Sequence, residues 1–102
     1  MADLPESLVA LQRRVDAAWA AVETHRQQVD ARRRAQAVPV RELAKWQVQP
    51  LPVWTPGEDE EHTRLMGIVT AAAEALHAGI AEAGLTEDYA TVQGLHAAAR
   101  EA

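Results

Sequence analysis

The chain has 102 residues and a formal net charge of −5, and it contains no cysteine and no phenylalanine. This length suits a single domain, so we expect residues 1–102 to form one unit. The absence of cysteine excludes disulfides, thiolate metal sites and cysteine nucleophiles. Residues 1–51 carry eight Lys/Arg against six Asp/Glu, a net charge of +2, whereas residues 52–102 carry two against nine, a net charge of −7. We expect the two halves to attract each other, within a hairpin or across a dimer.

The first predicted helix spans about residues 4–37 and carries a heptad repeat of apolar residues. Asp3 is a candidate N-cap, with Pro5 in the first turn and Glu6 completing a capping box. A strict seven-residue repeat places its apolar positions along one narrow stripe, here called the seam, and favours left-handed packing against another helix of the same chain or of a second copy. His25 also falls on this stripe, as a polar register residue. The seam, which we predict to be the self-association surface, consists of Leu4, Leu8, Leu11, Val15, Val22 and Val29.

The last part of this helix is basic. On a straight helix Arg26 and Arg33 fall back onto the seam, so we expect the last two turns to project beyond their partner or to meet an acidic group. A short basic run at a helix end also favours the negative end of the helix dipole. The other interpretation is a contact surface for an anion or a nucleic acid, although phosphate tracking needs a broader basic surface. The candidate residues are Arg26, Arg32, Arg33 and Arg34.

Residues 38–55 are predicted to form a proline-rich crossing segment. Pro50 and Pro52 force residues 48–54 into an extended conformation, and there is room for two short helical turns between Pro39 and Gln47. The segment is apolar rather than polar, which argues against a solvated linker, and a loop of this length in a compact domain packs or has a function. Its apolar residues either cover the protein's own core or bind a partner. The candidates for partner binding are Trp46, Leu51, Val53 and Trp54.

The second predicted helix spans about residues 56–83. Its start is the clearest in the chain, because Thr55 is an N-cap, Pro56 takes the first helical position and Glu58 completes a Thr-x-x-Glu capping box. Gly84 is well placed to end the helix in the left-handed conformation. The predicted buried stripe contains Leu65, Val69, Ala72, Leu76, Ile80 and Ala83.

The third predicted helix spans about residues 87–101, with Thr86 as its N-cap. Its buried face is expected to contain Tyr89, Val92, Leu95 or His96, and Ala99.

The sequence does not predict a membrane span or a signal peptide. The longest strongly apolar stretch, residues 65–73, is too short to cross a bilayer, and the N-terminal residues have neither a basic nor an apolar leader region. We therefore expect a cytoplasmic protein without a membrane partner.

Two pairs of residues have the Glu-x-x-His spacing of di-metal sites in helical bundles, or its Asp equivalent. They are Glu74 with His77, and Asp59 with His62. Helical periodicity turns Glu74 and His77 away from the predicted core, so we expect them to be solvated. Ser7 is the only serine and lies in the first turn of a helix. We therefore predict no catalytic residue, no metal and no cofactor.

Residues 80–92 superficially resemble a DNA-binding helix-turn-helix, with a suitable Gly-Leu-Thr turn at Gly84. The resemblance implies a recognition helix that opens at Glu87 and Asp88, which would face phosphates with negative charge. Ile80 stands where such motifs have a small residue, and Gln93 where they have an apolar one.

Two protein families are also similar in part. Residues 8–15 look like the start of the first helix of the all-helical chorismate mutases, and residues 39–42 look like their first interhelical segment. This resemblance implies a three-helix enzyme that holds a dianion with arginines, but Gln12 and Val29 stand where arginines are expected. The chain also resembles the secreted Trp-Xaa-Gly family of cysteine-free helical hairpins. Its turn, residues 54–57, is one residue longer than that family's, and residues 89–93 lack the acidic residue of its export signal.

Together these patterns predict an all-α protein of three main helices, with a long first helix, arranged as an antiparallel helical bundle or hairpin with a proline-rich crossing segment. The predicted function is protein–protein interaction, as a homodimer or as an accessory subunit, without catalytic chemistry. The alternative is a small nucleic-acid-associated regulator that uses the basic end of the first helix. Two further alternatives are a secreted helical hairpin and a chorismate-mutase-like enzyme.

Overall fold

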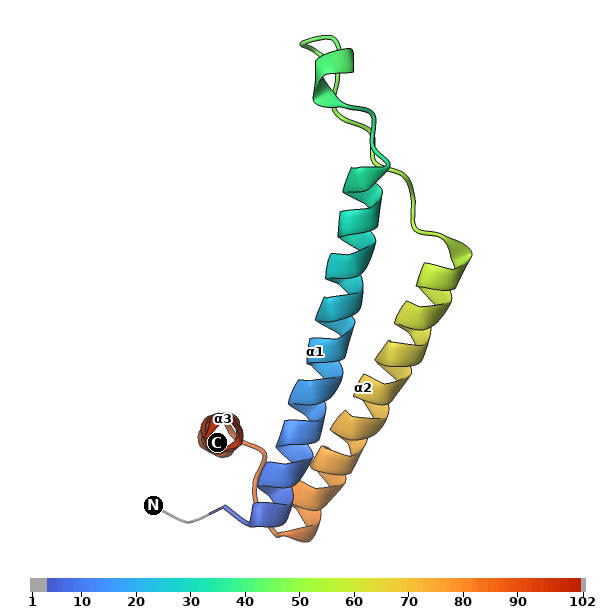
Figure 1. Ribbon diagram of the computed structural model, residues 1–102. Helices are drawn as coiled ribbons and strands as arrows, with labels where there is room; N and C mark the ends of the chain where they lie inside the picture. The colour runs from blue at the N-terminus through green and yellow to red at the C-terminus, as the bar shows by residue number, and fades with distance from the viewer. Residues whose placement is uncertain (1–3, 102) are drawn as a thin grey trace.

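The computed structural model describes residues 4–101, and the prediction of an all-α chain is confirmed for them (Figure 1). The elements are α1 (Glu6–Ala35), the 3₁₀ turn η1 (Val40–Glu42), α2 (Pro56–Glu82) and α3 (Tyr89–Arg100). The molecule is elongated, with extents of 60 × 26 × 23 Å. Its two long helices therefore leave much of their surface outside any core.

The long helices α1 and α2 lie side by side (Figure 1). Arg32 in the last turn of α1 contacts Glu58 in the first turn of α2, and the first turns of α1 lie against the last turns of α2. Two leucine side chains of α1 pack directly on Gly79 of α2, where a Cβ atom would lie 2.8 Å from Leu11 Cδ1 and 2.9 Å from Leu8 Cδ2. This glycine in the interior of a helix is therefore explained by packing, since any side chain would displace two leucines.

Two small clusters form the core. The lower one joins α1, α2 and α3 around four buried residues, Leu8, Val9, Ile80 and Leu95. The upper one joins α1 and α2 around Ala18, Val22, Leu65 and Val69.

The seam of α1 faces these clusters. Leu8, Val22 and Val29 are buried, and the other three seam residues, Leu4, Leu11 and Val15, are half-buried. Apolar burial of this kind is the main favourable term in folding, so the seam is used within the chain itself.

The helix ends agree with the sequence at α2 and differ elsewhere. The capping box of Thr55 and Glu58 is present, with Pro56 in the first turn. After α2, Gly84 has φ +70°, and the N–H groups of Gly84 and Leu85 donate to the carbonyls of Ala81 and Ile80. These are the two bonds of a Schellman motif.

The ends of α1 lie inside the predicted range. The helix begins two residues later and ends two residues earlier than predicted, with Pro5 as an N-cap that makes no side-chain hydrogen bond. The predicted cap, Asp3, lies outside the described residues.

The predicted start of α3 is wrong. Its N-cap is Asp88, whose carboxylate accepts a hydrogen bond from the Thr91 N–H at 2.9 Å, rather than Thr86. Tyr89, assigned to the buried face, is 81% exposed, because α3 turns only the Leu95 side of its surface toward α1. Ala83, assigned to the buried stripe of α2, is also exposed, because it is the C-cap beyond the last packed turn.

The proline-rich segment extends beyond the end of α1 and returns to the start of α2 (Figure 1). Instead of two helical turns it contains η1 and a single turn closed by the Gln47 N–H and the Ala44 carbonyl at 2.9 Å. The Gln49 amide donates to the Val38 carbonyl at 2.9 Å and links the outgoing leg to the returning leg. We call residues 38–53 the tip segment.

Helix α2 is long and apolar enough to cross a membrane by length and composition alone. The apolar stretch of residues 65–73 covers only part of this helix, so the sequence did not predict this property. Core helices of soluble proteins can reach the same length and hydropathy. Only 17% of the most apolar 18-residue stretch of α2 is buried, so this helix exposes much apolar surface.

Candidate interaction surface

Two arginines fasten the returning leg of the tip segment to α1. The guanidinium of Arg32 holds the Glu58 carboxylate at two points, with 3.0 Å between Nε and Oε2 and a second contact between Nη2 and Oε1. Arg32 also donates to the Val53 carbonyl at 3.2 Å, and Arg33 Nε donates to the Pro52 carbonyl at 2.6 Å. The basic end of α1 thus does meet an acidic group, and it also fixes the path of the backbone into α2.

Glu58 has two roles at this junction. Its Oε1 accepts a hydrogen bond from the Thr55 N–H at 2.8 Å as part of the capping box, while both carboxylate oxygens bind Arg32. The hydrogen bond from Arg32, followed by that from the Thr55 backbone, lowers the pKa of Glu58 from 4.5 to about 2. The carboxylate therefore stays ionised over the whole physiological range.

Trp54 lies next to the Arg32–Glu58 contact in the sequence, and its ring lies between two histidines. Its ring makes edge-to-face contacts with His25, at a centroid distance of 5.7 Å, and with His62, at 5.6 Å. His25 Nε2 lies 2.9 Å from the Glu58 carbonyl, which gives this polar seam residue its partner. His62 Nδ1 is buried, and no hydrogen-bond partner within residues 4–101 reaches it. Trp54 is half-buried here and packs between the helices, which is the covering role that the sequence left open.

The other three partner-binding candidates lie on the surface. Trp46 is 82% exposed, Val53 82% and Leu51 39%. Val48, which is 89% exposed, and Val40, at 68%, were not among the predicted partner-binding residues. Six of the nine exposed large apolar residues of the described chain lie in the tip segment, so exposure is concentrated there rather than scattered. They are Val38, Val40, Trp46, Val48, Leu51 and Val53.

The four candidate arginines for anion binding are not gathered into one surface. Arg32 and Arg33 are half-buried in the contacts described above. Arg26 forms an exposed pair with Glu23 at 3.6 Å, and Arg34 is exposed in the last turn of α1. Three of the four guanidiniums thus have intramolecular partners, and Arg26 and Arg34 are the two exposed residues of the set.

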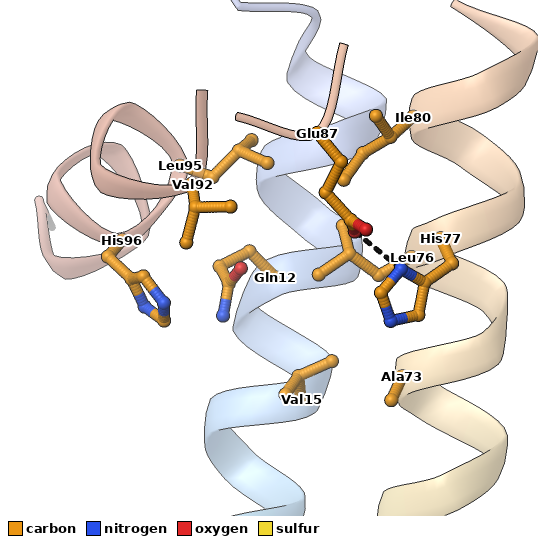
Figure 2. Close-up of a pocket in the computed structure, with 10 residues that line it drawn as sticks. All are labelled: Gln12, Val15, Ala73, Leu76, His77, Ile80, Glu87, Val92, Leu95 and His96. Atoms are coloured by element: carbon orange, nitrogen blue, oxygen red, sulfur yellow. Dashed lines mark ion pairs between the residues drawn. The ribbon is translucent and has the colours of Figure 1, made fainter. Parts of the chain in front are cut away.

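A pocket of about 400 Å³ lies at the other end of the molecule, where α3 packs beside α1 (Figure 2). Most of its wall is apolar. Four polar side chains reach it, and the carboxylate of Glu87 is ion-paired with His77 Nδ1. The lining residues are Gln12, Val15, Ala73, Leu76, His77, Ile80, Glu87, Val92, Leu95 and His96.

Gln12 is the buried polar residue of this pocket. It is only 3% exposed, and its amide nitrogen donates to Asp16 Oδ1 at 3.0 Å. No hydrogen bond within the described residues uses its amide oxygen.

Arg13, on the next position of α1, holds α3 in place. Its guanidinium donates to the carbonyls of Ala99 and Glu101, at 3.3 and 3.0 Å. A cation on the last carbonyls of a helix satisfies both their hydrogen bonds and the helix dipole.

The two pairs with Glu-x-x-His-like spacing do not form sites. His77 pairs with Glu87 across the α2–α3 connection rather than with Glu74, and His62 lies against Trp54. Among residues 4–101, no group of three or more His, Asp or Glu converges as a metal ion would require.

Helical spacing did not predict the contacts of Arg13, the burial of Gln12 or the histidine contacts of Trp54. Arg13 and Trp54 join residues from different elements, and helical spacing says nothing about which elements meet. For Gln12 the sequence offered one signal, a polar residue directly after the apolar residues 8–11.

No protein-family model matches the sequence, and no curated protein or solved structure matches it either.

Proposed function

We propose that this protein is a small protein-interaction module, an antiparallel helical hairpin with α3 docked on α1, which presents its tip segment to a protein partner. The exposed apolar side chains of the tip segment carry the proposal. Exposed apolar patches of monomers commonly mark interaction sites, and tryptophan is enriched among the residues that dominate binding energy. The protein acts in the cytoplasm, as a homodimer or as an accessory subunit, without catalytic chemistry of its own.

The tip segment suits binding because it is already ordered on one side. Arg33 holds the Pro52 carbonyl, Arg32 holds the Val53 carbonyl and Gln49 holds the Val38 carbonyl. Pro50 and Pro52 restrict the backbone further. The tip segment therefore loses less conformational entropy when it binds a partner than a flexible loop would lose.

A protein partner is favoured over a nucleic acid. Arg32 and Arg33 are engaged with Glu58 and with backbone carbonyls, so phosphates would compete with an existing two-point ion pair. The tip segment contains Arg41 and Lys45 against Glu42, a net charge of only +1. Tracking a phosphate backbone needs a larger basic surface than this.

Site-specific photocrosslinking in cells tests the proposal. A photoreactive amino acid replaces Trp46 in one variant and Trp19 in the control, because both are surface tryptophans, 82% and 49% exposed, and Trp19 lies on α1 outside the tip segment. We expect discrete protein adducts from position 46 and none from position 19, and we expect Val48→Ser to reduce the adducts. Absence of adducts at 46, or equal adducts at both positions, would refute the proposal.

A further inference from the structure

We infer that the partner of the tip segment is a second copy of this chain, and that Trp46 of each copy enters the other copy's pocket between α1, α2 and α3. The inference rests on the proposed function and names its partner. Its starting point is that one chain carries both an exposed tryptophan and an unfilled apolar pocket of about 400 Å³.

The two features cannot meet within one chain. The pocket is lined by Val15 of α1, and 20 residues of helix separate Val15 from Ala35, a distance of about 30 Å at roughly 1.5 Å per residue. The tip segment extends farther still in the same direction (Figure 1). Trp46 can therefore reach such a pocket only on another molecule.

The pocket fits an indole ring in size and chemistry. Its volume lies at the lower end of the range for small organic ligands, roughly 300–1,000 Å³. Val15, Leu76 and Val92 contribute to its apolar wall (Figure 2). A buried indole N–H needs an acceptor, and the Gln12 amide oxygen is an acceptor on the pocket wall that no hydrogen bond within the described residues uses.

Charge also favours this contact. Arg41 and Lys45 are exposed on the tip segment close to Trp46 in the sequence. The pocket carries Glu87 on its wall and Asp16 next to Gln12, and it lies largely in the half of the chain that has a net charge of −7. Opposite charges around an apolar contact steer association and fix orientation.

Two such contacts close a symmetric dimer. Because the tryptophan and the pocket lie at opposite ends of a 60 Å molecule, two copies side by side in opposite directions satisfy both contacts at once. A side chain of about 250 Å² that is 82% exposed loses about 200 Å² on full burial. The pocket wall offers about half of that area, so two insertions remove about 600 Å² in total. Val48 beside each tryptophan brings the total to around 800 Å², the size of a weak and transient interface.

Sedimentation equilibrium of the full chain, from micromolar to submillimolar concentration, tests the inference. The wild-type protein is expected to form a dimer. Trp46→Ala should raise the dimer dissociation constant at least about thirty-fold, the effect of truncating a hot-spot tryptophan. Ala73→Trp, which fills the pocket, should do the same. Trp19→Ala, a control at a half-exposed tryptophan of α1, should leave the constant unchanged.

Mixing the two defective variants gives the decisive result. Trp46→Ala keeps the pocket and Ala73→Trp keeps the tip, so an equimolar mixture regains one of the two contacts and should dimerise more tightly than either variant alone. A wild-type monomer at every concentration, a dimer unaffected by Trp46→Ala, or a mixture without recovery would each overturn the inference.

A cross-linking variant protects the test against misfolding of Ala73→Trp. The chain contains no cysteine, so Lys45→Cys combined with Glu87→Cys should give a covalent dimer on oxidation, whereas Lys45→Cys combined with Glu60→Cys should not. Equal yields from both would refute the contact. Failure of these experiments together with protein adducts at position 46 in cells would show that the tip binds a different protein, whereas failure of both would remove the proposed function itself.

Discussion

Replacing Gly79 by alanine tests how closely the two long helices approach. In an exposed helix interior, glycine costs about 1 kcal/mol relative to alanine. Gly67 shows that situation, because an added Cβ would meet nothing within 4 Å. At Gly79 the same atom would lie 2.8 Å from Leu11 Cδ1 and 2.9 Å from Leu8 Cδ2. Leu11 is half-buried and can move, but Leu8 is only 2% exposed and belongs to the lower core.

The two substitutions should therefore have different effects on stability. Gly67→Ala should raise the free energy of unfolding by about 1 kcal/mol. Gly79→Ala has the same gain in helix propensity, but overpacking a core costs about 1–3 kcal/mol. The net change in the free energy of unfolding should therefore range from about zero to a loss of about 2 kcal/mol. Urea unfolding followed by circular dichroism measures both values. If Gly79→Ala stabilised the protein as much as Gly67→Ala, the helices would not touch at this position and the described register would be wrong.

Three further predictions concern the junction and α3. Trp54→Ala should destabilise the monomer by about 2 kcal/mol, below the roughly 3–5 kcal/mol of a fully buried tryptophan, whereas Trp46→Ala should leave thermal unfolding of the monomer unchanged. The folded-state pKa of Glu58 is lowered from 4.5 to about 2, so its ionised carboxylate contributes fully to the free energy of unfolding above pH 4.5, and this contribution is lost as the pH falls toward 2. Glu58→Gln should therefore flatten the dependence of melting temperature on pH in that interval. Leu95→Ala should cost about 2–5 kcal/mol and speed amide exchange in α3 first, and uniform acceleration along the chain would contradict its local role.

Local signals in the sequence were enough where a structure is set by neighbouring residues. The α2 start follows from Thr55, Pro56 and Glu58, and its end follows from Gly84. All of these act within one or two turns, so no knowledge of the fold is needed. The seam was visible for the same reason, since helical periodicity alone defines the face that must be covered.

The α3 start shows the limit of that reasoning. Thr86 and Asp88 can each cap a helix, and which of them does so depends on the path of the connection between α2 and α3. Selecting Thr86 shifted the expected boundary by two residues and left Tyr89 assigned to a face that it does not share.

Most of the candidate site could not be predicted, because long-range contacts define it. Trp46 and Trp54 are both tryptophans within the same proline-rich segment, yet one is exposed and the other lies between two histidines. Only the position of α2 relative to α1 distinguishes them. The pairing of Arg32 with Glu58 likewise needs the returning leg to bring together residues that are 26 positions apart.

This same pairing predicts the order in which the molecule folds. Closing the chain between Arg32 and Glu58 forms a loop of 26 residues, whereas joining Leu11 to Gly79 first would close a loop of 68. The entropy of loop closure makes the shorter loop less costly by about 0.9 kcal/mol. Each helical turn that pairs from that end then leaves a shorter loop to close for the next pair of turns. Substitutions at Arg32 should thus slow folding, and substitutions at Leu95 should mainly speed unfolding.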